Sequence, residues 1–148
     1  MSYVSSYHHC VFSTKERRPL ITLALRDRLW PFMGGIARQN KMTAVEIGGV
    51  QDHVHILLAL PSTISIAKAL QLIKGASSKW VHDTFPEHWS FGWQTKYGAF
   101  SVSMSQLDKT IAYIKTQEDH HRKMTFQEEF VALLNKHRIE YDARYLWD

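Results

Sequence analysis

The pattern of apolar and polar residues predicts four β-strands and two helices within residues 6–103. Short runs rich in aromatic and β-branched residues, bounded by glycine, proline or polar residues, are typical of strands. Apolar residues that recur every three or four positions indicate amphipathic helices. These criteria predict strands at residues 6–14, 43–50, 52–60 and 97–103, and helices at residues 22–40 and 65–82.

Capping residues mark the beginning of both helices. Thr22 and Ser65 precede the two helical patterns, and a hydroxyl oxygen at this position accepts a hydrogen bond from the first helical turn. Pro31 lies inside the first pattern, where a proline removes a backbone hydrogen bond, and Gly34 and Gly35 follow it. We therefore expect this helix to be kinked or broken.

The order strand, helix, strand, strand, helix, strand is that of the split βαβ, or ferredoxin-like, arrangement. In this α+β fold the strands form one antiparallel sheet and both helices cover the same face, which leaves the other face open for a site. The chain has 148 residues, an ordinary length for one domain, so residues 1–148 are predicted to form a single domain.

Two further helices are predicted after the last strand. Ser105–Asp108 has the pattern of a capping box and opens a third helix that reaches about His121, and Thr125–Glu128 opens a final helix in the same way. In the third helix, Tyr113 and Gln117 are four positions apart and share a face away from the apolar stripe. An exposed aromatic residue beside an exposed amide is one explanation, and a functional pair is the other.

Composition narrows the class of protein. The chain is 45% hydrophobic and 22% charged, as globular proteins are, and no apolar run approaches the roughly 20 residues that a membrane span requires. The N-terminus lacks the features of a signal peptide. Cys10 is the only cysteine, which excludes an internal disulfide and fits a reducing cytosol. A net charge of +4 is compatible with nucleic-acid binding without requiring it.

Two histidines begin the most apolar of the predicted strands. Alternate side chains point to the same face of a strand, so His53 and His55 project together and are spaced to hold one cation. Two histidines with ordinary hydrogen-bond partners at a strand end are the alternative. A metal on two imidazoles keeps coordination positions open, as a catalytic site requires, although imidazoles alone suit softer metals better than magnesium.

Tyr113 and Gln117 have side chains that suit such a site. Tyrosine is an accepted covalent nucleophile, and the glutamine side chain offers a neutral oxygen ligand. A metal beside them would act as a Lewis acid on a phosphate oxygen and orient it for in-line attack. The chain has no Gly-rich loop of the kind that cradles nucleotide phosphates, so no nucleotide cofactor is expected. Spacing alone does not bring the tyrosine and the histidines together.

Five stretches, in order and at characteristic separations, carry a likeness that runs nearly end to end: Val11–Lys15, Gly48–Leu57, Tyr97–Ser103, Tyr113–His121 and Phe126–Phe130. Together they resemble the single-tyrosine, HUH-type transposases of the insertion sequence 200/605 group, the IS200-like transposase family. A lone His-hydrophobic-His motif is weak evidence, whereas the whole set is specific.

This resemblance implies transposition of single-stranded DNA in the cytoplasm of a bacterial or archaeal cell, in association with the nucleoid. Tyr113 would attack a scissile phosphodiester, form a 5′-phosphotyrosine link and release a 3′-hydroxyl, and a different 3′-hydroxyl would reverse the step. His53, His55 and Gln117 would hold the metal, which is magnesium or manganese in this family. Members act as homodimers that recognise imperfect hairpins at element ends, and the tyrosine helix of one subunit completes the partner's metal site.

Basic residues are candidates for contacts to the DNA backbone, although each also has the ordinary explanation of a solvated surface charge. Two alternative functions stay open: a metal-dependent single-strand endonuclease that uses water, with Tyr113 only positioning, and a non-catalytic DNA-hairpin-binding relative. The candidates for DNA contacts are Lys15, Arg17, Arg18, Lys74, Lys79 and Lys96.

Overall fold

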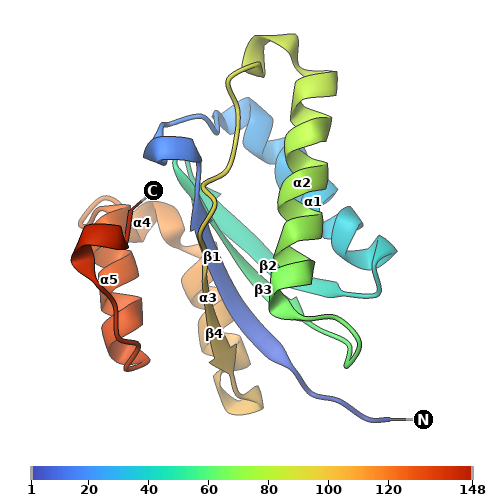
Figure 1. The fold of residues 1–148 in the computed structure, drawn as a ribbon, viewed down its shortest axis with the longest axis vertical. Coiled ribbons are helices and arrows are strands. Elements are labelled where there is room, and N and C mark those ends of the chain that lie inside the picture. The colour runs from blue at the N-terminus through green and yellow to red at the C-terminus, as the bar shows by residue number, and fades with distance from the viewer. Residues whose placement is uncertain (1, 148) are drawn as a thin grey trace.

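Four antiparallel strands form the sheet in the computed structural model, which describes residues 2–147 (Figure 1). Their spatial order is β2-β3-β1-β4, with β1 and β3 in the centre. This is the split βαβ order, so the predicted α+β, ferredoxin-like fold is confirmed. The strands are β1 (Tyr7–Ser13), β2 (Thr43–Val50), β3 (His53–Ala59) and β4 (Gly98–Val102).

Two long helices, α1 (Leu23–Gln39) and α2 (Ile66–Thr84), cover one face of the sheet, as predicted (Figure 1). Both predicted caps are present. The Thr22 hydroxyl accepts a hydrogen bond from the first turn of α1 at 3.1 Å, and the Ser65 hydroxyl does the same for α2 at 3.1 Å. These bonds satisfy backbone N–H groups that have no partner within the helix.

The predicted break of the first helix is wrong, because α1 runs from Leu23 to Gln39 without interruption. Pro31 is exposed, whereas Leu29 and Met33 on either side of it are fully buried against the sheet and α2. The backbone hydrogen bond that proline removes therefore lies on the solvent side. Burial of the apolar face outweighs that loss and holds the helix together.

Three helices lie on the opposite face: α3 (Leu107–Lys115), α4 (Gln117–His120) and α5 (Phe126–Lys136) (Figure 1). The third predicted helix is thus divided at Thr116, whose hydroxyl donates to the carbonyl oxygen of Ala112 and so competes with the helical backbone. The predicted capping box at its start is also wrong. Ser105 lies in a 3₁₀ turn, Met104–Gln106, and its hydroxyl pairs with that of Ser103.

The last helix begins as predicted. The Thr125 hydroxyl accepts from the Glu128 backbone N–H, and the Glu128 carboxylate accepts from the Thr125 N–H, which completes a capping box. Short 3₁₀ turns at Lys15–Arg17, Pro86–His88 and Ala143–Tyr145 complete the described elements.

Two glycines allow helices to lie close on the sheet. A Cβ atom on Gly48 in β2 would lie 2.4 Å from the carbonyl oxygen of Ile114 in α3, and one on Gly98 in β4 would lie 2.9 Å from the ring of Phe130 in α5. Contacts this short do not occur between real side chains. The two glycines therefore set how near α3 and α5 come to the strands.

The sheet separates two apolar clusters of very different size. The larger, between the sheet and α1 and α2, contains 18 buried residues, among them Phe12, Leu29 and Leu70. The smaller, beneath α5, contains six, and Leu146 and Trp147 near the C-terminus pack against it. The six are Val11, Phe100, Phe126, Phe130, Leu133 and Leu134. Within residues 2–147, no helix combines the length and hydrophobicity that crossing a membrane requires.

Candidate active site

The two histidines of β3 lie on the face of the sheet that α3 and α5 cover. Both side chains are fully buried, and their ring centroids are 5.1 Å apart. Val54 between them and Ile56 after them point the other way, into the larger apolar cluster. Strand alternation thus separates the polar residues from the main core and directs both imidazoles to one place.

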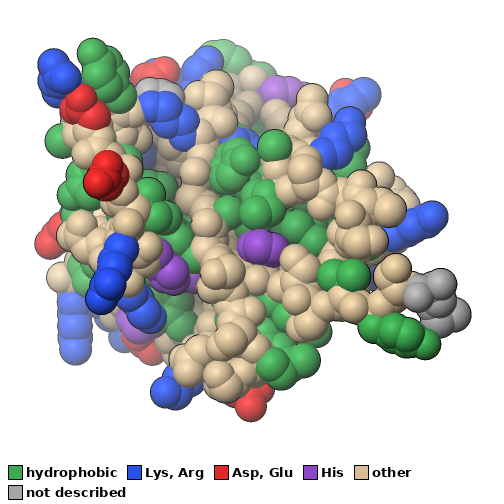
Figure 2. Space-filling model, turned by 60° about the horizontal axis from the view of Figure 1, so that its bottom comes forward, with side chains coloured by type: hydrophobic (Ala, Val, Ile, Leu, Met, Phe, Trp, Pro, Cys, Tyr) green, Lys and Arg blue, Asp and Glu red, His purple; other side chains and the backbone are tan. Residues whose placement is uncertain are grey.

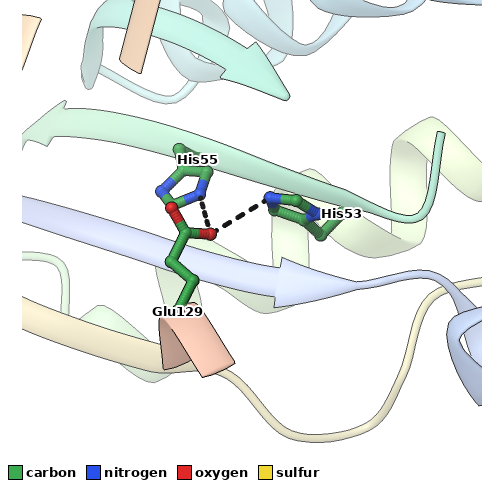
Figure 3. A group of neighbouring side chains, drawn as sticks. All are labelled: His53, His55 and Glu129. Carbon is green, nitrogen blue, oxygen red and sulfur yellow. Dashed lines mark hydrogen bonds and ion pairs between the residues drawn. The ribbon is translucent and has the colours of Figure 1, made fainter. Parts of the chain in front are cut away.

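A carboxylate that the sequence analysis did not identify lies between these histidines. Glu129 extends from α5 toward β3, and its Oε1 atom is 3.3 Å from His53 Nε2 and 3.1 Å from His55 Nε2 (Figure 3). Its side chain is 1% exposed, so the charge is shielded from water. The other oxygen, Oε2, accepts a hydrogen bond from the Tyr113 hydroxyl. One carboxylate therefore links the histidine pair to the tyrosine.

Tyr113 in α3 and Gln117 in α4, which lie on either side of the break at Thr116, both contact the same histidines. Gln117 is buried, and its Oε1 atom accepts a hydrogen bond from His53 Nε2 at 3.1 Å. Its Nε2 atom donates to the Tyr113 carbonyl oxygen at 3.3 Å, which bridges the break at Thr116. The Tyr113 ring centroid is 5.7 Å from that of His55. The structure thus brings all four sequence-predicted residues together within one chain.

Three further side chains form hydrogen bonds with His53, His55 and Glu129, and none of the three was assigned a role from the sequence. Asp52 Oδ1 accepts from His53 Nδ1 at 2.8 Å, and His9 Nε2 pairs with His55 Nδ1 at 2.7 Å. Because each Nδ1 atom is engaged in this way, both Nε2 atoms face Glu129. His121 Nε2 donates to Glu129 Oε1 at 2.9 Å.

Burial and charge set the protonation of the histidines. Burial lowers the pKa of His55 to about 4 and that of His9 to about 3, so both imidazoles are neutral at pH 7. Burial acts in the same direction on His53, but hydrogen bonds with Asp52 and Glu129 outweigh it and raise the pKa of His53 to about 9. Without a metal, His53 therefore carries a positive charge beside the Glu129 carboxylate.

The pKa values of Glu129 and Tyr113 are shifted in opposite directions. Burial would raise the pKa of Glu129, but hydrogen bonds from His121, His53 and His55 hold it well below its usual range. Burial and the neighbouring Glu129 carboxylate raise the pKa of Tyr113 above its ordinary value. The site thus pairs an ionised carboxylate with a neutral phenol.

The donor set of His53, His55 and Glu129 fits a divalent metal ion. One ligand atom from each residue, two nitrogens and one oxygen, lie within 4.8 Å of one another. A carboxylate oxygen is a ligand that magnesium and manganese prefer, so Glu129 supplies what two imidazoles lack. A cation would also take the place of the proton on His53 that Asp52 and Glu129 stabilise.

The basic residues predicted to contact DNA make contacts with other residues of this chain. Lys79 pairs with Asp83 at 2.6 Å and Arg18 with Glu16 at 3.1 Å, and burial lowers the pKa of Lys74 to about 8. Lys15, Arg17 and Lys96 lie near the C-terminal segment and the loop before β4: Lys15 packs beside Gly92, Arg17 lies over the Trp147 ring, and Lys96 Nζ donates to the Tyr145 carbonyl oxygen.

Comparison with known proteins connects this arrangement to a family. The family model described as "Transposase IS200 like" matches residues 2–117, which includes the histidine pair, Tyr113 and Gln117 but ends before α5 and Glu129. The ISDra2 transposase TnpA of Deinococcus radiodurans is 26% identical over 117 residues, covering 76% of this chain and 84% of that protein.

Two solved structures share the fold. A crystal structure from Deinococcus radiodurans R1, described as a transposase, matches with a TM-score of 0.64 and 28% identity over 79% of this chain and 95% of that one. The structure of a REP-associated tyrosine transposase bound to a REP hairpin matches with a TM-score of 0.60 and 14% identity, over 82% of this chain and 72% of that one.

Proposed function

Because the chain belongs to the IS200-like transposase family, we propose that it cleaves and rejoins single-stranded DNA through a covalent link between Tyr113 and a 5′-phosphate. One observation carries this proposal: a single carboxylate, Glu129, accepts the Tyr113 hydroxyl proton in a hydrogen bond and also lies between His53 and His55. A nucleophile and a candidate metal site thus lie side by side, as phosphodiester transfer requires.

The transfer step follows from the contacts of Tyr113. Its phenolic oxygen forms a bond to phosphorus, the bond from phosphorus to the 3′-oxygen breaks, and the 3′-oxygen takes up a proton. The phenol releases one proton as its bond to phosphorus forms, and the departing 3′-oxygen takes one up. Glu129 Oε2, which accepts the hydrogen bond from the Tyr113 hydroxyl, orients the phenolic oxygen. The phosphotyrosine link preserves the energy of the phosphodiester, so a second 3′-hydroxyl can displace Tyr113 without a nucleotide cofactor.

We propose that His53, His55 and Glu129, with Gln117 beside His53, hold magnesium or manganese. The bound cation would supply Lewis-acid polarisation of a phosphate oxygen. Asp52 and His9 orient the two imidazoles through their Nδ1 atoms, and the burial of all three candidate ligands excludes water that would compete with the tyrosine.

The expected partner is single-stranded DNA with imperfect hairpins at element ends. In support, the REP-associated tyrosine transposase that shares this fold is bound to a REP hairpin. A homodimer stays a prediction. Since the Tyr113 hydroxyl already contacts Glu129 of its own chain, exchange of tyrosine helices between subunits is not needed to assemble the site. Contacts of Lys15, Arg17, Arg18, Lys74, Lys79 and Lys96 with DNA also stay predictions.

The test is to mix the protein with a single-stranded element end and Mn²⁺, and to look for a protein–DNA adduct that survives denaturation. We expect the adduct with the wild type and with Tyr141→Phe, a control at an exposed tyrosine. Tyr113→Phe should form none, because it lacks the nucleophilic oxygen, and EDTA should abolish the adduct in the wild type.

Two other outcomes would favour the alternatives. Free cleaved ends, produced equally by Tyr113→Phe, would indicate an endonuclease that uses water, with Tyr113 only positioning. Intact DNA in a stable complex, with no cleavage by the wild type at any metal concentration, would indicate a non-catalytic hairpin-binding protein. Either result would overturn the proposed covalent mechanism.

A further inference from the structure

A cleft of about 550 Å³ opens beside Tyr113, between α3 and α5 and over β4. Tyr113 and His9 form part of its wall, so the cleft reaches the proposed nucleophile directly. Its volume is typical of small-molecule sites and suits a unit as large as one nucleotide. None of the steps described above uses it. Its other polar and aromatic lining includes Gln106, Lys109, Thr110, Phe100, Lys136 and His137.

The fixed charges on the wall of this cleft are all positive. Lys109 on α3 and Lys136 on α5 line it, and no aspartate or glutamate is among the described residues that do. Within residues 2–147, neither lysine takes part in an ion pair. Lys109 is four residues before Tyr113 and so lies on the same helix face. On the face of the molecule drawn in Figure 2, histidine side chains and Lys and Arg side chains both reach the surface.

The cleft on the other side of α3 has the opposite character. Glu46, Glu118 and Asp119 line it with Arg26 and Lys115, and both cations are already paired there: Arg26 with Glu118 at 2.7 Å and Lys115 with Glu46 at 4.0 Å. Carboxylates repel a phosphate backbone, whereas free ammonium groups attract it. The charge difference across α3 therefore indicates from which side a strand of DNA reaches Tyr113.

An aromatic pair gives the cationic cleft a surface for a base. The His137 ring stacks on the Phe100 ring, with centroids 4.5 Å apart and an angle of 27° between the planes. His137 Nδ1 donates to the Leu133 carbonyl oxygen at 2.8 Å, which fixes the ring. Flat side chains beside a basic groove are how proteins bind single strands without reading their sequence.

We propose that this cleft binds the nucleotide next to the scissile phosphate, with its phosphate between Lys109 and Lys136 and its base against His137. This assignment rests on the proposed function, in which Tyr113 attacks that phosphate. It identifies single-stranded DNA, held through its backbone and a base face, as what occupies the cleft. It also gives α5 a second role, because the helix that carries Glu129 then also carries part of the substrate contact.

The test measures binding without chemistry. Fluorescence anisotropy with a labelled oligothymidine of about 10 nucleotides, in EDTA, gives the dissociation constant over a range of salt concentrations. Each lost phosphate contact should reduce the slope of log affinity against log salt by about 0.7. We therefore expect the double variant Lys109→Gln/Lys136→Gln to lose about 1.4 of slope and to bind roughly tenfold more weakly at physiological salt.

Lys115→Gln is the matched control, because Lys115 is on the same helix but lines the acidic cleft. It should leave the slope unchanged. Equal slopes for the wild type and the double variant would overturn the cleft assignment, even if Tyr113 still forms its adduct. Conversely, the double variant could show the reduced slope while the wild type forms no adduct. That result would support the cleft assignment and count against the covalent mechanism alone. His137→Ala should weaken binding without changing the slope, since stacking releases no counterions.

Discussion

The two faces of the sheet are built by the same strands but stabilised in different ways. On the face covered by α1 and α2, 18 buried apolar residues pack together. On the opposite face the apolar cluster beneath α5 contains six buried residues, and next to it lie His53, His55, Gln117 and Glu129, all fully or nearly fully buried. Alternation along β3 makes this division, since Val54 and Ile56 face one way and the histidines the other.

The difference shows where the fold places stability and where it places chemistry. Apolar contacts on the first face are non-directional and hold the sheet whatever the pH. The second face depends on hydrogen bonds between buried polar groups, which are costly unless every partner is in place. We therefore expect α3 and α5 to open at a lower free energy than α1 and α2.

The largest expected effect is a loss of stability in Leu29→Ala, and Leu133→Ala on the opposite face is its comparison. Leu29→Ala, in the larger cluster, should lower the free energy of unfolding by about 2–5 kcal/mol, measured by urea denaturation. Hydrogen exchange of α5 amides should stay unchanged in this variant, because their opening leaves Leu29 buried. Leu133→Ala should accelerate exchange of those same amides. If Leu29→Ala speeds exchange in α5 as much as in α1, the two faces open together and the comparison fails.

Two glycine substitutions test how closely α3 must pack on the sheet. Gly48→Ala should cost about 1–3 kcal/mol of stability and slow adduct formation, because the new methyl group would collide with the Ile114 carbonyl oxygen and push α3 away from β3. Gly75→Ala, in α2, is the control, since nothing lies within 4 Å of its Cβ position. It should stabilise the protein by about 0.5–1 kcal/mol. Equal effects of the two substitutions on stability would show that α3 is free to move.

The first face was the more predictable of the two, because its features repeat locally. The apolar periods of α1 and α2 and the caps Thr22 and Ser65 follow from neighbouring residues alone. Pro31 misled because its effect depends on which side of the helix faces solvent, a tertiary property. The division at Thr116 was not predicted either, although the bond from the Thr116 hydroxyl to the Ala112 carbonyl oxygen is a local feature.

At the site, strand alternation was enough to place His53 and His55 on one face, but not to bring Tyr113 to them. That contact depends on how α3 packs across the sheet, which Gly48 permits and no spacing reveals. Glu129 directly follows the Thr125–Glu128 capping box and was not predicted as a site residue. Its signal was a charged residue between Phe126 and Phe130, on the apolar stripe of α5.

The last effect is a pH dependence that the histidines of the second face produce. The pKa of His55 is lowered to about 4 and that of His9 to about 3, whereas both should titrate near 6.5 in the unfolded chain. As the pH falls below 6.5, the unfolded state binds protons that the folded state does not, so stability decreases by up to about 1.4 kcal/mol per pH unit for each histidine. The loss ends at about pH 4 for His55 and pH 3 for His9.

His53 acts in the opposite direction, because its pKa is raised to about 9. Its contribution is complete below pH 6.5 and is lost as the pH rises through 9. Metal-free protein in EDTA should therefore be most stable near pH 6.5 in urea titrations. His9→Gln should flatten the acid side by about 1.4 kcal/mol per pH unit and leave the alkaline side unchanged. A curve that is flat between pH 4 and 6.5, or an unchanged acid slope in His9→Gln, would mean that these imidazoles are not buried as neutral groups.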